Sequence, residues 1–133
     1  MAELCFNMFN RSAWFGIDPD LPAQIDAAAA AGFPLVGPDV FSLDAWTAHG
    51  RAVEELAEQM AAVGVGCWEI AGFDVGARDD TLAQAEHIAE LARVLRPTWI
   101  LTNVSLPVDA DVATTLALAC DRFDAVGVRP AIE

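Results

Sequence analysis

The chain has 133 residues, of which 55% are hydrophobic and 20% are charged, a composition typical of a folded globular protein. Seven arginines, no lysine and twenty acidic residues give a formal net charge of −13. A nucleic-acid-binding protein needs a basic stripe, so this charge argues against a nucleic-acid partner. No apolar run approaches the roughly 20 residues of a membrane span, and the start lacks a basic leader. We therefore expect a cytoplasmic protein that does not bind membranes.

Apolar runs and helical periodicity predict an alternation of strands and helices within a single domain, residues 1–133. The predicted strands cover residues 4–9, 34–40, 65–70, 98–103 and 128–133. The predicted helices cover residues 21–31, 43–63 and 81–95, with a fourth from Asp109 or Asp111 to about Val126. Loops are expected at residues 10–18, 71–78 and 104–108.

Capping residues and glycines set the expected ends of these helices. The predicted N-terminal signals are Asp18-Pro19-Asp20 for the first helix, Ser42 for the second, and Asp79 or Asp80 for the third. The predicted stops are Gly32, Gly64, Pro97 and Gly127.

The predicted strands begin about 30 residues apart, which is the length of one strand–helix unit. Alternating units with continuously apolar strands indicate a parallel sheet with right-handed crossovers. Two architectures fit that description. One is a five-stranded doubly wound, flavodoxin-like sheet, which would make the chain a binding module without sugar chemistry. The other is the first five strands of an eight-stranded TIM barrel, which the even spacing and the final Ile132-Glu133 favour.

Three stretches resemble the sugar phosphate isomerase/epimerase family, which has the xylose isomerase-like TIM barrel. Two of them are residues 20–32 with the short strand that follows, and the helix end at residues 59–65. The most specific is Gly127-Val128-Arg129-Pro130-Ala131-Ile132-Glu133. It is similar to the family's Gly-Val-x-(small or apolar)-x-Ile/Leu-Glu strand, whose glutamate ligates a catalytic divalent metal. The resemblance covers the first five of the eight strands.

The resemblance implies a metal-dependent isomerase or epimerase that moves a proton between adjacent carbons of a small sugar, sugar phosphate or keto-polyol. It implies that Glu133 is both a catalytic residue and a ligand of Mn²⁺ or Mg²⁺. The other ligands of the family come from strands six to eight, so we expect this chain to be truncated, inactive alone and without a metal of its own. Strand three also lacks the histidine that the family often has, and Asp39 would stand in for its acid on strand two.

Polar and aromatic residues near the predicted strand ends are the other candidates for substrate binding. Asn7 and Arg11 are suited to contact a sugar or a phosphate, and Trp14 to stack on a sugar ring. Asp39, Glu69 and Asn103 also lie at strand ends, although turn or cap duty is the alternative for each. Burial of Glu69 toward a barrel axis would raise its pKa. The weaker candidates are Asn10, Phe15, Asp74 and Ser105.

Two further expectations concern the cysteines and the sheet edges. Cys5, Cys67 and Cys120 show no Cys-x-x-Cys spacing, so we expect reduced, buried thiols. A partial barrel leaves two unpaired strand edges, which favour self-association.

Overall fold

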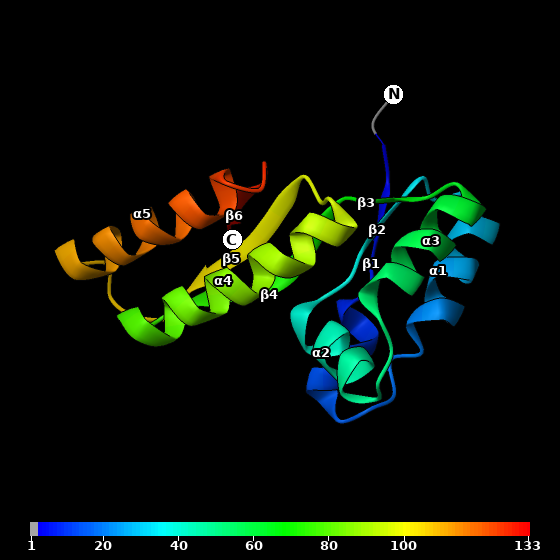
Figure 1. Ribbon diagram of the computed structural model, residues 1–133, viewed down its shortest axis with the longest axis horizontal. Helices are drawn as coiled ribbons and strands as arrows, with labels where there is room; N and C mark the ends of the chain where they lie inside the picture. Colours follow the sequence, from blue (N-terminus) through cyan, green and yellow to red (C-terminus); the bar gives the residue numbers. More distant parts are fainter. Residues whose placement is uncertain (1–2) are drawn as a thin grey trace.

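The computed structural model describes residues 3–133, and strands alternate with helices along nearly all of this length (Figure 1). The strands are β1 Cys5–Asn7, β2 Leu35–Gly37, β3 Gly66–Cys67, β4 Glu69–Val75, β5 Trp99–Val104 and β6 Arg129–Ile132. The α-helices are α1 Leu21–Ala30, α2 Val40–Ala48, α3 Val53–Val63, α4 Arg78–Leu95 and α5 Ala110–Asp124. Two single-turn 3₁₀ helices, η1 Phe9–Arg11 and η2 Ala13–Phe15, follow β1.

The strands form two three-stranded parallel sheets, in the orders β1-β2-β3 and β4-β5-β6. Only Trp68 separates β3 from β4, and a bridge between Asp39 and Ala71 links the two sheets. The chain therefore has the five predicted strands in sequential order, with the third interrupted at Trp68. A flavodoxin-like sheet would place β1 between two other strands, whereas β1 here pairs with β2 alone among the described residues. The doubly wound alternative is wrong.

The strand register repeats the 30-residue spacing of the sequence. Cys5 lies opposite Leu35, Glu69 opposite Trp99, and Trp99 opposite Arg129. Each step along the chain therefore returns the backbone to the same level of the neighbouring strand. This is the stacking expected of successive units of a barrel, and the carboxyl ends of the strands come to lie along one rim.

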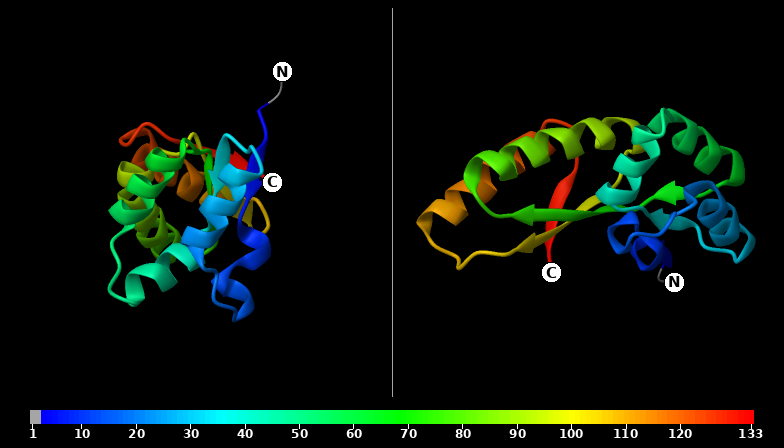
Figure 2. Two further views of the ribbon diagram at one scale, coloured as in Figure 1. Left: turned by 90° about the vertical axis from the view of Figure 1, so that its right-hand side faces the viewer. Right: turned by 90° about the horizontal axis from the view of Figure 1, so that it is seen from below.

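The helices form a row in which α1 packs against α3, α3 against α4, and α4 against α5. Figure 2 shows α4 and α5 on one face of the β4-β5-β6 sheet. Side chains that alternate along β4 explain this arrangement: Phe73 and Val75 are fully buried, while Asp74 between them is exposed. Phe73 meets Phe123 of α5 edge to face, with ring centroids 5.1 Å apart. The apolar core thus lies between sheet and helices, as on the outer side of a barrel wall.

The single helix predicted over residues 43–63 is instead two helices, α2 and α3. Gly50 adopts a left-handed conformation with φ of 76°, which ends α2 at a tight turn. The Trp46 indole Nε1–H donates to the Ala52 carbonyl at 2.8 Å, and the Arg51 guanidinium lies 4.1 Å from the Trp46 ring. The sequence did not reveal this turn, because the helical spacing of apolar residues continues from Trp46 to Val53 across it.

Strand three also differs from its prediction. It continues as β4 to Val75, so residues 71–75 are strand and not loop. The N-caps differ in two places: Asp39 caps α2 in place of Ser42, and α4 follows Ala77, with Asp79 and Asp80 inside its first turn. The other caps are confirmed, since Asp20 caps α1 and Asp109 caps α5. Gly32, Gly64 and Gly127 follow their helices in left-handed conformations, as predicted.

All three cysteines are free and partly buried, as expected. Burial, with the nearby Glu69 carboxylate, raises the pKa of Cys5 to about 11. Burial likewise raises the pKa of the Cys67 and Cys120 thiols. Of the helices in residues 3–133, none is long and apolar enough to cross a membrane.

Candidate functional site at the carboxyl ends of the strands

A cleft of about 720 Å³ lies where β1, β4, β5 and β6 reach their carboxyl ends. We call it the rim cleft. Four of the predicted site residues, Asn7, Trp14, Asn103 and Glu133, line it together. They come from β1, the 3₁₀ helix η2, β5 and the residue after β6. The other lining residues are Phe9, Asn10, Phe41, Ala71, Gly72, Asp74, Leu101, Val104 and Ser105.

One wall of the rim cleft is aromatic. The rings of Trp14 and Phe41 lie with centroids 4.7 Å apart and planes tilted by 46°. Trp14 is 64% exposed, so most of its indole remains open to a ligand. Gly72 makes room for this pair, because a Cβ there would lie 2.9 Å from the Phe41 ring. An exposed aromatic surface of this kind is suited to the apolar face of a ring-shaped ligand.

The remaining lining of the rim cleft includes polar and acidic side chains. Asp74 and Asn103 lie side by side in the register of β4 and β5. The Ser105 hydroxyl donates to Asp74 Oδ1 at 2.5 Å. The Glu133 backbone N–H donates to the Thr102 carbonyl at 3.1 Å, which extends the pairing of β6 with β5 and fixes Glu133 at the rim. The cleft therefore presents two carboxylates and several amide and hydroxyl groups.

Glu69 lies beneath the rim, between strands. It is 9% exposed, and its Oε1 accepts a hydrogen bond of 2.9 Å from Asn7 Nδ2. Burial raises the pKa of the Glu69 carboxyl, the Asn7 hydrogen bond lowers it, and the negative charge of Glu133 raises it further, with a net upward shift. The other end of the Asn7 amide is also fixed, since Oδ1 accepts from the Phe9 N–H at 2.8 Å. Glu69 thus sets the orientation of Asn7 in the cleft.

Three predicted site residues, Glu69, Asp39 and Arg11, are not among the residues that line the rim cleft. Glu69 lies beneath the cleft and contacts Asn7, so the structure gives it a supporting position and not one on the cleft surface. Asp39 is 0% exposed, and both of its carboxylate oxygens accept hydrogen bonds from Ser12 and Ser42. It cannot touch a ligand in this arrangement, because its role as the N-cap of α2 has drawn it into the core. Arg11 is exposed in η1 and is not among the residues that line the cleft.

Phe41 is the principal cleft residue that sequence reasoning missed. It lies in the first turn of α2, two residues after the Asp39 cap, where the sequence predicts only the end of a strand. The signal available was an aromatic residue in the first turn of a helix that follows a parallel strand, since that turn lies near the carboxyl ends of the strands. Asp74 and Ser105, which were weaker candidates, belong to the cleft.

The donors of the rim cleft match a hard divalent cation only in part. Carboxylates such as Glu133 and Asp74 are suitable ligands for Mg²⁺ or Mn²⁺, which take about six oxygen donors. Within residues 3–133, no group of three histidine, cysteine or acidic side chains lies close enough to hold an ion. The described residues can therefore contribute ligands to such a site but do not complete one.

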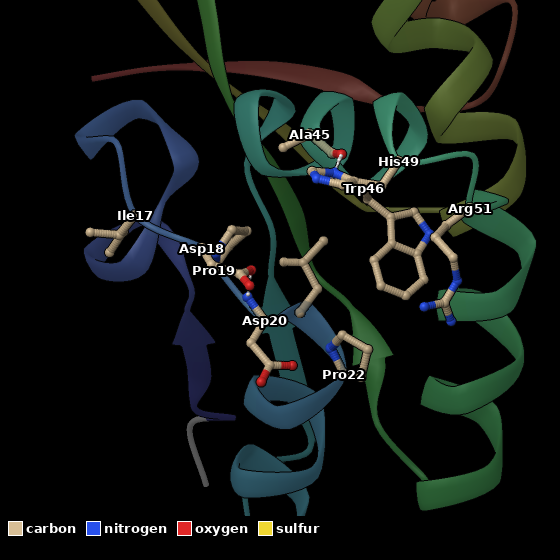
Figure 3. Close-up of a pocket in the computed structure, with 10 residues that line it drawn as sticks. Ile17, Asp18, Pro19, Asp20, Pro22, Ala45, Trp46, His49 and Arg51 are labelled. Atoms are coloured by element: carbon tan, nitrogen blue, oxygen red, sulfur yellow. Dashed lines mark hydrogen bonds between the residues drawn. The ribbon is translucent and has the colours of Figure 1, made fainter.

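A second cleft of about 710 Å³ lies between the start of α1 and the end of α2 (Figure 3). Its walls include Asp18, Asp20, Trp46 and Arg51. The His49 ring lies beside the Ala45 carbonyl, 2.6 Å from Nδ1 to oxygen. The cleft contains no residue from a strand end, so it is separate from the rim cleft and supplies control positions for experiments there.

No protein-family model matches the sequence, and no curated protein sequence is similar to it. Solved structures, in contrast, are similar over nearly the whole chain. The IolI protein with a bound zinc atom aligns over 98% of this chain with a TM-score of 0.76 and 12% identity. A xylose isomerase domain protein from Alicyclobacillus acidocaldarius aligns over 98%, with a TM-score of 0.70 and 13% identity. A xylose isomerase-like TIM barrel protein from Mycobacterium smegmatis, in complex with magnesium, aligns over 99%, with a TM-score of 0.68 and 16% identity.

The chain spans about half of each of these structures, namely 51%, 49% and 56% of their lengths. It matches only 22% of a xylose isomerase-like TIM barrel/4-hydroxyphenylpyruvate dioxygenase fusion protein, at 20% identity. At such identities the similarity establishes the fold. These residues have the fold of part of a xylose isomerase-like TIM barrel.

Proposed function

We propose that the rim cleft binds a small sugar or related polyol, as one part of the active site of a metal-dependent isomerase or epimerase. The observation that supports this proposal is the convergence of Trp14, Asn103, Asp74 and Glu133 on one cleft. That cleft lies at the carboxyl ends of parallel strands, where barrel enzymes have their active sites. The zinc and magnesium in the structures of similar fold are in keeping with it.

The two walls of the cleft suit the two kinds of surface on a sugar. The open face of Trp14 accepts the C–H face of the ring, and the amide and carboxylate groups of Asn103 and Asp74 accept or donate hydrogen bonds to hydroxyls. Asn7 presents its remaining amide hydrogen from an orientation that Glu69 fixes. Fixed donors and acceptors lower the entropic cost of holding the ligand.

Isomerisation next to a carbonyl requires a group that takes a proton from one carbon and returns it to the next, a role suited to a carboxylate. We assign that carboxylate, and one metal ligand, to Glu133. When bound, a divalent ion would polarise the carbonyl and hydroxyl oxygens of the sugar. Residues 3–133 contain no cluster of three side chains that could hold the ion by themselves. We therefore propose that they form only part of the metal site.

Sugar binding can be tested with the purified chain and D-xylose as the probe. We expect Trp14→Ala and Asn103→Ala to weaken binding at least about tenfold, the effect of losing a well-positioned contact. Trp46→Phe, in the second cleft, is the matched control and should bind like the wild type. Unchanged binding by Trp14→Ala, or a loss caused by Trp46→Phe, would contradict the assignment of the sugar to the rim cleft.

Calorimetry with Mn²⁺ tests the role of Glu133 separately. Glu133 would be supported as a ligand if the wild type bound Mn²⁺, Glu133→Gln did not, and the control Glu58→Gln bound it like the wild type. Absence of Mn²⁺ binding by the wild-type chain would exclude a catalytic role for these residues alone, while leaving the xylose result intact.

We also propose that the chain associates with a second copy through its sheet edges. Among the described residues, β1 pairs only with β2 and β6 only with β5, so each presents an open edge. Ile132, in β6, is 61% exposed. Sedimentation equilibrium should show association that Ile132→Lys weakens and Val108→Lys, on an exposed loop, does not. A monomer at all concentrations would refute this.

A further inference from the structure

A fully buried carboxylate connects the rim cleft to the N-terminus of α2. Asp39 is 0% exposed, as are the two serines that contact it. Ser12 Oγ donates to Asp39 Oδ1 at 2.7 Å, and Ser42 Oγ donates to Asp39 Oδ2 at 2.8 Å. The Ser42 backbone N–H also donates to Oδ1, at 3.0 Å. The sequence separates Ser12 from Asp39 by 27 residues, so this is a tertiary connection and not only a helix cap.

The Asp39 carboxylate determines which way both serine hydroxyls point. A carboxylate can only accept hydrogen bonds, so each hydroxyl must give its single proton to Asp39. Each serine oxygen then has lone pairs left to accept from other groups. Ser12 Oγ accepts from the Trp14 backbone N–H at 3.0 Å, and Ser42 Oγ accepts from the Ala13 N–H at 3.1 Å.

These two amides belong to the first residues of η2, the turn that carries Trp14. The first N–H groups of a helix have no partner inside it. Here, both are satisfied by hydroxyls whose orientation depends on one carboxylate. The η2 turn is therefore docked on α2 through its backbone, although the Trp14 side chain itself is 64% exposed.

The same docking sets the geometry of the aromatic wall. Phe41, the partner of Trp14 in that wall, is two residues from Asp39 in the chain and lies in the first turn of α2. Asp39 therefore fixes both rings, Phe41 through the start of its helix and Trp14 through the serines. A rigid pair of rings offers a ligand a preformed surface, which a freely moving indole would not.

We propose that Asp39 is a positioning residue that holds Trp14 in place at the rim cleft. It does not contact the ligand, and its influence on ligand selection passes through Ser12, Ser42 and the η2 turn. The role concerns the shape of the cleft and requires neither the metal nor the proton transfer proposed above.

Fluorine NMR of protein labelled with 5-fluorotryptophan tests this inference without any ligand. The chain has four tryptophans, and Trp14→Phe identifies the Trp14 resonance by its disappearance. In Asp39→Asn, an NH₂ group that donates hydrogen bonds replaces one carboxylate oxygen that accepts them. One serine hydroxyl can then no longer donate to residue 39 and must point its proton elsewhere. Ser12→Ala is the second variant. It removes the acceptor of the Trp14 N–H and one donor to Asp39, while both bonds from Ser42 to Asp39 remain.

We expect Asp39→Asn and Ser12→Ala to shift the Trp14 resonance and to increase its solvent isotope shift, while the signals of Trp46, Trp68 and Trp99 stay in place. Asp109→Asn is the matched control, because Asp109 caps α5 in the same way, 2.9 Å from the Val112 nitrogen, far from η2 in sequence. It should leave the Trp14 resonance unchanged. If Asp39→Asn does not fold, Ser12→Ala decides the question.

A Trp14 resonance that is unmoved in folded Ser12→Ala would overturn the inference, as would an equal shift of all four signals. The same samples can be titrated with D-xylose, for which we expect roughly tenfold weaker binding by Ser12→Ala than by the wild type. If the wild type does not bind xylose, the proposed function fails, whereas the ligand-free shift still decides the role of Asp39.

Discussion

The Asn7 amide donates a 2.9 Å hydrogen bond to Glu69, and the two side chains meet across the intervening strand β2. Asn7 lies in β1 and Glu69 at the start of β4, with Gly37 of β2 between them. A Cβ at Gly37 would lie 2.6 Å from Glu69 Cγ and 2.7 Å from Oε1. The absence of a side chain at Gly37 therefore lets the buried Glu69 carboxylate reach Asn7 across β2.

Gly37→Ala should displace Glu69 and break its bond to Asn7. The added methyl group is overpacked against buried atoms, so we expect the free energy of unfolding to fall by about 1–3 kcal/mol. Urea unfolding provides the measurement. Gly76→Ala is the control, because a Cβ there meets nothing within 4 Å. Equal stability of the two variants would show that Glu69 does not occupy the space above Gly37.

Replacement of Glu69 by glutamine should alter how stability depends on pH. The pKa of Glu69 is raised in the folded protein above its usual value of 4.5. The folded state therefore favours the protonated carboxyl, and this contribution, complete below pH 4.5, is lost as the pH rises through the folded pKa. The stability of the wild type relative to Glu69→Gln should fall as the pH rises above about 4.5.

Urea unfolding between roughly pH 4 and 7 measures this difference. The variant Glu58→Gln, at an exposed position of α3, serves as the reference for removal of one charge. A raised pKa would be contradicted if the difference in free energy of unfolding between the wild type and Glu69→Gln did not change with pH. It would also be contradicted if the wild type became relatively more stable as the pH rose.

The Cys5 thiol should react slowly in the folded chain. Its pKa of about 11 lies two units above the ordinary 9.0, so the reactive thiolate is about a hundredfold scarcer near pH 8. In Cys67→Ser/Cys120→Ser protein, the rate with a disulfide reagent should be about a hundredfold lower folded than unfolded in urea. Similar rates in the two states would refute the effect of burial.

Removal of the Phe123 ring should be among the most damaging core substitutions. Phe123 and Phe73 are both fully buried and meet edge to face between α5 and β4. We expect Phe123→Ala to lower the free energy of unfolding by about 3–5 kcal/mol, measured by guanidinium denaturation. Val108→Ala, at a side chain that is 77% exposed, should change it by less than about 0.5 kcal/mol. A small loss for Phe123→Ala would show that this contact contributes little.

Periodicity and glycine stops were sufficient to predict the five strands, their order in a barrel and the ends of most helices. They could not reveal the turn at Gly50, because the apolar spacing runs from Trp46 into α3 without a change of phase. The continuation of strand three to Val75 was hidden by Gly72 and Asp74, residues that usually mark loops. Both errors arise where tertiary packing overrides a local preference.

Their positions near the carboxyl ends of predicted strands made Asn7, Trp14, Asn103 and Glu133 candidates, and all four line the rim cleft. The same reasoning misplaced Asp39, because an acid after a strand can serve either the rim or the helix that follows. That choice depends on Ser12, a residue 27 positions away. Such long-range hydrogen bonds leave no periodic trace in a single sequence.

The strictly sequential pairing of the strands has a consequence for how the chain folds. Each strand finds its partner about 30 residues away, as Cys5 does in Leu35 and Trp99 in Arg129. Within residues 3–133, no strand pairing joins β1 to β6, so pairing these strands does not require the closure of a long loop. Folding can begin at any one unit and spread to its neighbours in either direction, as in a solenoid.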